Sequence, residues 1–208
     1  MLPNRVGNHL WRAIVPTSPM RLTLYATGAG EPRLLENGEI QAYDSAGFFP
    51  DGKRVLACGS AAGQLTRCYV QDLDGGAPRA ITPPGTSHGL ISPDGSSVLV
   101  RGPDERFFIY ATTGGAPKSV QGTTSDDEVI RWSANGLSLL LNHKGKVPAR
   151  IERLDLLTGK RTLVKELAPP SLSGVVNIRN IAFADNERSY AYTFDRVLCR
   201  MASVSGLK

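Results

Sequence analysis

The 208-residue sequence is poor in the residues that build metal and thiol sites, with three histidines and three cysteines. His9, His88 and His143 are far apart, and none belongs to a ligand pair, which argues against a zinc site. The glycine motifs of P-loop and Rossmann proteins are missing, as are the catalytic-loop and Asp-Phe-Gly motifs of protein kinases. We therefore expect no metal, no cofactor and no catalytic residues.

Long hydrophobic runs are also missing. No stretch of 18 apolar residues occurs, which excludes a membrane-spanning helix of ordinary length. Residues 1–10 (MLPNRVGNHL) lack the apolar stretch of a signal peptide. As written, the sequence predicts a chain that stays in the cytoplasm, where it is made.

What the sequence does contain is an internal repeat. Residues 48–56 (FFPDGKRVL) return as residues 91–99 (ISPDGSSVL) and, more loosely, as residues 132–140 (WSANGLSLL). The Asp or Asn positions 51, 94 and 135 are 43 and 41 residues apart. A period near 40 residues with short β segments is typical of the blades of a β-propeller.

A second motif follows each Pro-Asp-Gly turn with the same period. It is glycine-rich and occurs at residues 72–81 (DLDGGAPRAI), 111–120 (ATTGGAPKSV) and 155–164 (DLLTGKRTLV), with an earlier copy at residues 26–35. Both motifs suit tight turns, because proline presets φ, Asp bonds nearby backbone, and glycine accepts positive φ. Apolar, β-branched or aromatic runs lie between the turns and predict four strands per repeat.

The predicted fold is therefore all-β, a propeller of four-stranded antiparallel blades. Taken as one propeller domain over 1–208, it has three complete blades and two incomplete ones, at residues 44–84, 86–122, 127–168, 1–38 and 176–208. The first of the incomplete blades holds two or three strands. The chain is either a small five-bladed ring or, as we favour, the C-terminal piece of a larger propeller.

The repeat also predicts the structure of residues 161–167 and the role of Trp132. Residues 161–167 have some helical propensity, but their alignment with residues 79–81 and 118–120 predicts a strand. Trp132 directly precedes the third turn, where repeat equivalence assigns it to packing between blades. Trp11 is likewise predicted to be a core residue.

The cysteines are Cys58, Cys68 and Cys199. Cys58 and Cys68 are placed symmetrically about Gly63 on two strands of one predicted hairpin. A cross-strand disulfide is one interpretation if the compartment is oxidising. The interpretation we favour from sequence is two small buried apolar residues.

Residues 85–89 (GTSHG) match the Gly-x-Ser-x-Gly pattern of a nucleophile elbow. An elbow needs a helix after the serine, and here a Pro-Asp-Gly turn follows almost at once. We interpret the string as a loop between blades. If the chain were an enzyme, Ser87, His88 and Asp94 would be the only reactive set close in sequence.

Two charged stretches need an explanation. Residues 126–128 (DDE) have carboxylates that could bind a cation, but they lack the spacing of a calcium loop, and we favour a solvated loop. The net charge of +5 comes largely from a basic stretch between residues 144 and 165, opposed there only by Glu152 and Asp155: Lys144, Lys146, Arg150, Arg153, Lys160, Arg161 and Lys165. We interpret these as solvated blade edges, with polyanion binding as the alternative; nucleic acid is disfavoured because the blade lacks stacking aromatics.

Residues 92–95 (SPDG), 109–110 (IY), 114–115 (GG) and 72–82 resemble the TolB-like, WD-repeat-like (PD40) β-propeller repeat of bacteria. Residues 130–136, 148–155, 158–160 and the ending at 189–192 and 204–208 resemble the C-terminal end of a bacterial serine/threonine protein kinase family. In that family a kinase domain is joined through a membrane span to a TolB-like propeller. The kinase domain is absent here, so the resemblance implies an extracytoplasmic sensor or docking module without kinase activity.

The sequence predicts the function less clearly than the fold, because propellers host many functions. We expect a non-catalytic propeller module that binds a protein or peptide, as the sensor or scaffold part of a larger signalling protein. One alternative is a propeller-fold enzyme of lyase or peptidase type, or the gating domain of a hydrolase. A second is polyanion binding through residues 144–165. Open blade edges also predict self-association.

Overall fold

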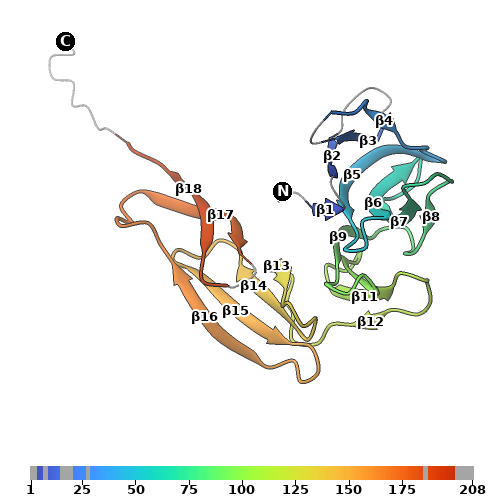
Figure 1. Cartoon of the computed structure of the whole chain (residues 1–208). Coiled ribbons are helices and arrows are strands. Elements are labelled where there is room, and N and C mark those ends of the chain that lie inside the picture. The colour runs from blue at the N-terminus through green and yellow to red at the C-terminus, as the bar shows by residue number, and fades with distance from the viewer. Residues whose placement is uncertain (1–3, 7–8, 15–20, 27–28, 185–186, 200–208) are drawn as a thin grey trace, which may run out of the picture. The chain divides into compact units, whose positions relative to one another are not determined.

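The computed structural model describes residues 4–6, 9–14, 21–26, 29–184 and 187–199. Within these ranges the chain is all-β, with strands and turns and no helix, as predicted (Figure 1). It therefore has no helix there that could span a membrane. The strands form four antiparallel sheets of four strands and one of two strands. The chain divides into two compact units, residues 1–125 and 126–208, which are described separately.

Unit 1 contains three four-stranded sheets in which neighbouring strands follow one another in sequence. The first is β1 (Asn4–Val6), β2 (His9–Ile14), β3 (Thr23–Ala26) and β4 (Arg33–Leu34). The second is β5 (Ile40–Phe48), β6 (Arg54–Ala61), β7 (Arg67–Asp72) and β8 (Arg79–Ala80), and the third is β9 (Ser87–Ile91), β10 (Ser97–Arg101), β11 (Phe107–Ala111) and β12 (Lys118–Ser119). The first sheet thus has four strands where the sequence suggested two or three. The side chains of His9 and Trp11 lie outside the described residues.

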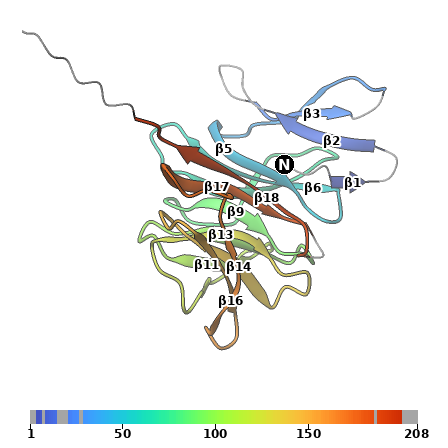
Figure 2. The same cartoon turned by 90° about the vertical axis from the view of Figure 1, so that its left-hand side faces the viewer.

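Unit 2 contains one four-stranded sheet and one two-stranded sheet. The four-stranded sheet is β13 (Asp127–Trp132), β14 (Ser138–His143), β15 (Ala149–Asp155) and β16 (Arg161–Leu167), so the predicted strand at residues 161–167 is confirmed. The two-stranded sheet is the hairpin of β17 (Val175–Phe183) and β18 (Tyr190–Arg196), whose strands run side by side (Figure 2).

The Pro-Asp-Gly turns close the hairpins between the first and second strands of the sheets. In the copy at residues 92–97, the amide of Gly95, at φ 70°, donates to the carbonyl of Ser92. The Asp94 carboxylate accepts hydrogen bonds from the hydroxyl of Ser92 (2.6 Å) and from the amide and hydroxyl of Ser96 (3.0 and 2.7 Å). These bonds, that of Ser92 first, lower the pKa of Asp94 to about 2. Asp94 therefore serves the turn.

The same turn recurs where the sequence repeat is lost. Between β17 and β18 the amide of Ala184 donates to the carbonyl of Ser189, and the amide of Glu187 donates to Ala184. Glu187 has φ 55°, so it takes the left-handed conformation that glycine holds in the other copies. Its carboxylate pairs with Arg153 of β15.

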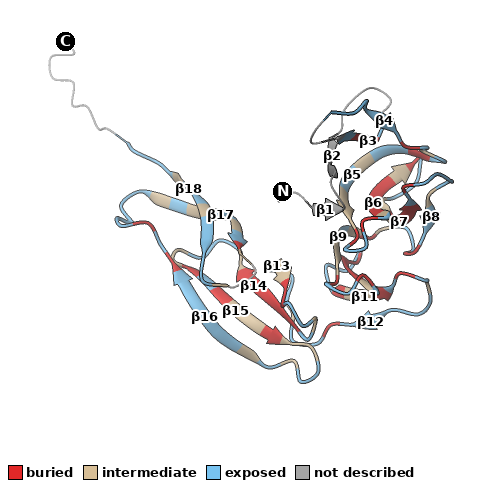
Figure 3. Ribbon diagram, viewed as in Figure 1, coloured by how far each residue is buried: buried red, intermediate tan, exposed pale blue. Residues whose placement is uncertain are grey.

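Two clusters of buried side chains hold unit 1 together. One joins Leu22, Leu24 and Leu35 of the first sheet region to residues of the second, including Val55 and Ala57. The other joins the second sheet to the third and contains Phe49, Leu56, Cys58, Cys68, Val70, Ile81, Val98, Val100 and Tyr110. Figure 3 shows buried residues concentrated in the middle strands of the four-stranded sheets, such as β6, β7, β10 and β14, whereas β16 and β18 are largely exposed. Burial of apolar side chains between successive sheets is the packing expected of propeller blades.

Unit 2 has its own core between its two sheets. Leu140, Ala149, Ile151 and Leu167 of the four-stranded sheet pack with Ile178 and Phe183 of β17. Trp132 is 5% exposed, so its predicted burial is confirmed.

Candidate functional site

The first strands of the sheets converge within each unit. β5 lies beside β9 in unit 1, and β13 lies beside β17 in unit 2. Each of these four strands contains an extra residue relative to its partner strand, once in β9 and β13 and twice in β5 and β17, which makes β-bulges. Bulges re-aim side chains and are common next to functional sites. Because the irregularity recurs in successive repeats, we take the bulged first strands as the candidate site.

The bulge in β9 places a histidine in a special conformation. Leu90 pairs with Leu99 and Ser87 with Arg101, so His88 and Gly89 together oppose Val100. His88 has φ 57°, in the left-handed region that few residues other than glycine adopt. Its side chain is exposed. A strained backbone that presents a polar side chain to solvent is a feature associated with function.

His88 is hydrogen-bonded to its neighbour. The Nδ1 atom of its ring lies 2.8 Å from the Oγ atom of Ser87, which is half-buried. Asp94, the third member of the reactive set considered from the sequence, is instead bonded to Ser92 and Ser96 in the turn that follows. The structure thus brings Ser87 and His88 together and does not bring Asp94 to them. Ser87, His88 and Gly89 lie in β9 rather than in a loop, and no helix follows, so a nucleophile elbow is not formed.

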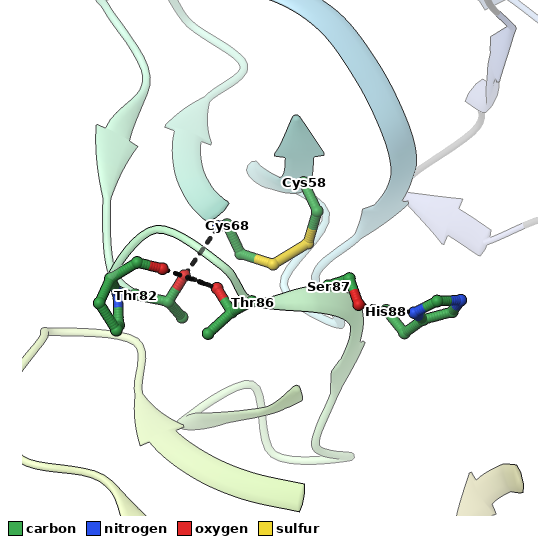
Figure 4. The surroundings of a disulfide bond; sticks show 7 residues. Cys58, Cys68, Thr82, Thr86, Ser87 and His88 are labelled. Carbon is green, nitrogen blue, oxygen red and sulfur yellow. Dashed lines mark hydrogen bonds between the residues drawn. A yellow bond between two sulfur atoms is a disulfide. The ribbon is translucent and has the colours of Figure 1, made fainter. Parts of the chain in front are cut away.

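A disulfide bond lies directly beneath this bulge. Cys58 of β6 and Cys68 of β7 are paired in register and are bonded through their sulfur atoms, and both are fully buried (Figure 4). The interpretation favoured from the sequence, two reduced apolar cysteines, is therefore wrong. Cys199 is free and exposed. A Cβ atom on Gly89 would lie 2.7 Å from the Cys58 sulfur, so only glycine lets β9 approach the disulfide this closely.

The backbone of Cys68 explains why the two cysteines can bond. Its amide donates to the hydroxyl of Thr82 (2.8 Å), and its carbonyl accepts from the amide of Ile81 (2.9 Å). Both groups thus point away from Cys58, which makes the cysteines a non-hydrogen-bonded pair, the kind whose Cα atoms lie closest. Thr82 is also 2.6 Å from the hydroxyl of Thr86, just before β9 (Figure 4). The disulfide, the connecting loop and the bulge therefore form one packed unit.

The neighbouring strand β5 extends the exposed polar surface. Gly47 of β5 lies next to Ile91 of β9, because a Cβ atom on Gly47 would be 4.0 Å from the Ile91 side chain. β5 and β9 run into equivalent turns, and alignment on these turns places Ser45 at the position of His88 and Asp44 at the position of Ser87. Asp44 and Ser45 are both exposed. We define the polar inner surface of unit 1 as Asp44, Ser45, Ser87 and His88.

Tyr43, which directly precedes Asp44 in β5, is not freely ionisable. Burial raises its pKa to about 12, with a smaller contribution from Tyr69. Its hydroxyl is 3.5 Å from the side-chain oxygen of Asn37, a long contact. Tyr43 therefore stays protonated at neutral pH, and its side chain packs against the buried cluster that joins the first and second sheets.

The acidic stretch at residues 126–128 is not the solvated loop that the sequence suggested. Asp127 is fully buried, and the guanidinium of Arg161 donates to both of its carboxylate oxygens, with Nη1 3.0 Å from Oδ1. This interaction raises the pKa of Arg161. Asp126 and Glu128, by contrast, are exposed. In the part of the chain that the structure describes, no group of three or more His, Cys, Asp or Glu side chains is placed to hold a metal.

The basic stretch at residues 144–165 is divided among separate partners. Arg161 pairs with Asp127 and Glu152, Arg153 with Glu187, and Arg150 with Glu166. Lys165 lies over the ring of Tyr190, 4.6 Å from its centroid. The remaining lysines lie in turns at opposite ends of the sheet, with Lys144 and Lys146 between β14 and β15 and Lys160 between β15 and β16. The stretch does not form one basic patch.

Sequence reasoning missed the residues at the bulges. Asp44, Ser45 and Asn180 belong to no motif, and a bulge leaves little mark in a sequence. One signal was available: the three occupy or adjoin the position of His88 when the repeats are aligned on their turns. Asn180 of β17 has φ 52°, like His88, and its side-chain amide donates to the hydroxyl of Thr193 (2.9 Å).

Comparison with known proteins identifies the fold. No protein-family model matches the sequence, and no curated protein matches it. Among solved structures, a TolB from Agrobacterium tumefaciens is similar with a TM-score of 0.66 at 16% identity, covering 91% of this chain and 67% of that one. TolB from Acinetobacter baumannii is similar with a TM-score of 0.63 at 17% identity, and the match covers 90% of this chain and 52% of that one. An oligogalacturonate lyase from Vibrio parahaemolyticus is similar with a TM-score of 0.63 at 13% identity, and the match covers 86% of this chain and 54% of that one. The chain thus spans about half the length of these two, and the predicted TolB-like β-propeller fold is confirmed.

Proposed function

We propose that this chain, which has a TolB-like β-propeller fold, is a non-catalytic module that binds a protein or peptide through the polar inner surface of unit 1. The observation that supports this most is the bulge in β9, where His88 is held exposed in a left-handed conformation above a buried disulfide. A rigid support beneath an exposed polar group favours binding, because little conformational entropy is lost when a partner is bound.

The geometry supports binding better than catalysis. Among the described residues, the Ser87 hydroxyl is the hydrogen-bond partner of the His88 ring, and the carboxylate that could orient the ring from the following turn is engaged elsewhere. Nucleophilic catalysis needs a base that is itself oriented by a third group. A surface of neutral and charged hydrogen-bonding groups suits recognition of polar side chains or peptide backbone.

We further propose that the module is the sensor or scaffold part of a larger signalling protein. The chain matches only part of each of the structures to which it is similar. The predicted relation to membrane-anchored kinases stays a prediction. The buried disulfide favours an extracytoplasmic location over a cytoplasmic one, because disulfides persist in oxidising compartments.

Binding can be tested by quantitative capture from extract of the source cell. Immobilised wild-type chain should enrich a defined protein that the double variant Asp44→Ala/His88→Ala loses. The matched control is Arg106→Ala, in an exposed turn between β10 and β11, which should retain the same partner. Equal enrichment by wild type and the double variant would refute the proposed surface, and no enrichment by any of them would refute a binding module.

An enzyme of lyase or hydrolase type is the second candidate. One of the similar structures is an oligogalacturonate lyase, and Ser87 and His88 are hydrogen-bonded on an exposed strand. This alternative predicts turnover of a polyuronide, ester or peptide substrate that Ser87→Ala or His88→Ala reduces at least about tenfold, as expected on removal of a general base or nucleophile. Turnover that is unchanged in both variants would exclude Ser87 and His88 as catalytic residues.

A further inference from the structure

The dipeptide Asn-Gly occurs twice in the chain, at residues 37–38 and 135–136. In this dipeptide the backbone nitrogen of glycine can attack the side-chain carbonyl carbon of asparagine and displace ammonia. Glycine favours the reaction because it has no Cβ atom to hinder the nitrogen or to restrict the backbone. The two sites therefore differ in reactivity according to how the fold holds the glycine amide.

Asn135 and Gly136 lie in the tight turn between β13 and β14. The Gly136 amide donates to the carbonyl of Ser133 (2.9 Å). The side-chain oxygen of Asn135 accepts from the Ser133 hydroxyl (2.7 Å) and from the Leu137 amide (3.1 Å), as the Asp94 carboxylate accepts in the equivalent turn. The nitrogen that would attack Asn135 is thus engaged inside a hairpin, and the turn must open before it can react.

Asn37 and Gly38 lie in a different kind of turn, which leads from β4 of one sheet to β5 of the next. The Asn37 carbonyl accepts from the amide of Ile40 (3.0 Å), so Asn37 is the first residue of the turn and Gly38, at φ 55°, is the second. The amide of the second residue of such a turn points away from its hydrogen bond. Accordingly, no bond from the Gly38 amide to a backbone carbonyl occurs among the described residues, and Gly38 is exposed.

The surroundings of the Asn37 side chain admit the other reactant, water. Asn37 lines a cavity of about 290 Å³, together with Arg21, Leu35 and Glu36. Its Oδ1 atom faces the Tyr43 hydroxyl at 3.5 Å. The side-chain oxygens of Asn37 and Asn135 both accept hydrogen bonds, so the main difference between the two sites is the state of the glycine amide.

We propose that Asn37 is a site of spontaneous deamidation in the folded chain, whereas Asn135 is protected. The Gly38 nitrogen gives its proton to water and attacks Cγ of Asn37, a C–N bond forms, and the side-chain nitrogen leaves as ammonia. Water then opens the resulting succinimide at either carbonyl and leaves aspartate or isoaspartate. One water is consumed and one ammonia is released, without a change of oxidation state.

The modification changes the entry to β5. Aspartate places a negative charge opposite the Tyr43 hydroxyl, on the wall of the cavity that Arg21 also lines. Isoaspartate inserts a methylene group into the main chain ahead of Ile40, and this alters the turn from which β5 begins. The proposal rests on backbone hydrogen bonding and does not depend on binding at the polar inner surface of unit 1.

Peptide mapping by mass spectrometry measures both sites in one sample. The purified chain is kept at mildly alkaline pH, folded or in denaturant, and sampled over time. Replacement of NH₂ by OH changes the mass of the peptide, whereas isomerisation at Asp-Gly sites does not. Each site's rate in the folded chain is divided by its rate in the denatured chain, which removes the effect of neighbouring sequence. This ratio should be at least about fivefold higher for Asn37 than for Asn135, the factor that corresponds to one net backbone hydrogen bond.

Asn37→Gln is the matched control, because its longer side chain forms the ring far more slowly. This variant should keep the mass of the peptide around position 37 and leave the rate at Asn135 unchanged. An Asn37 peptide that stays intact in the folded chain, while the denatured chain is modified there, would overturn the proposal. Equal ratios at the two sites, or a higher one at Asn135, would do the same, because the glycine amide would then not decide the reactivity.

Discussion

At the scale of single residues, the candidate site depends on a few positions where only one side chain fits. Gly89 is one of them, because β9 packs against the Cys58–Cys68 disulfide with no room for a Cβ atom. The next position back, His88, combines a positive φ with an exposed side chain. The exposed side chain of His88 is thus presented by a strand that is fixed through the buried contact of the next residue, Gly89.

Gly89→Ala should destabilise the chain by about 1–3 kcal/mol, the usual cost of overpacking a filled core. The added methyl group would lie 2.7 Å from both the Cys58 sulfur and a Leu56 methyl group. Gly47→Ala on β5 is the matched control, because its Cβ atom would lie 4.0 Å from its nearest neighbour and should change stability by less than about 1 kcal/mol. Urea unfolding measures both, and equal midpoints would mean that β9 does not rest on the disulfide as described.

Tyr43 should make the alkaline stability of the chain depend on pH. Below about pH 10 the folded and unfolded states both hold its proton. Between about pH 10 and 12 the unfolded state releases that proton while the folded state keeps it, because the folded pKa is about 12. The free energy of unfolding should therefore fall through this window, and Tyr43→Phe should make the fall shallower. Urea unfolding at several pH values checks this, with the exposed Tyr25→Phe as control; parallel pH profiles for wild type and Tyr43→Phe would contradict it.

Sequence reasoning succeeded at residues whose role is local. The Asp94 turn follows from Pro-Asp-Gly chemistry alone, and Asp94 does what the motif predicts. Asp127 was misjudged because its partner Arg161 is 34 residues away in sequence. The left-handed conformation of Glu187 and its ion pair with Arg153 were not predicted either, because nothing near Glu187 in the sequence indicates them.

At the scale of elements, the strands were predicted well because each lies between two recognisable turns. Residues 161–167 show the value of the repeat, since alignment to earlier copies outweighed local helical propensity. The bulges in β5, β9, β13 and β17 were not predicted. They depend on how a first strand packs against its neighbours, and a periodic pattern does not record that.

The disulfide between β6 and β7 makes a prediction at this scale. Without reductant, the denatured chain should react with one equivalent of a thiol reagent, at Cys199, and with three after reduction. Reduction or the double variant Cys58→Ala/Cys68→Ala should lower the free energy of unfolding by about 3 kcal/mol, as expected for a short closed loop. Three reactive thiols in chain purified from the natural compartment would show that the bond does not form there.

At the scale of the whole molecule, the period near 40 residues led to the right architecture, and the similarity to TolB structures at 16–17% identity confirms the fold. Such similarity does not transfer function, because propellers carry many activities. The binding role therefore rests on the polar inner surface of unit 1.

The most direct test of the binding role is site-specific photo-crosslinking. A photoreactive amino acid at position 88 should yield a discrete cross-linked product when the chain is exposed to extract of its source cell. The same amino acid at position 106, in the exposed turn after β10, should yield none. Asp44→Ala in the position-88 chain should reduce the product. Cross-links at position 106 but not at position 88 would contradict the account, because the partner would then bind away from the bulged inner strands.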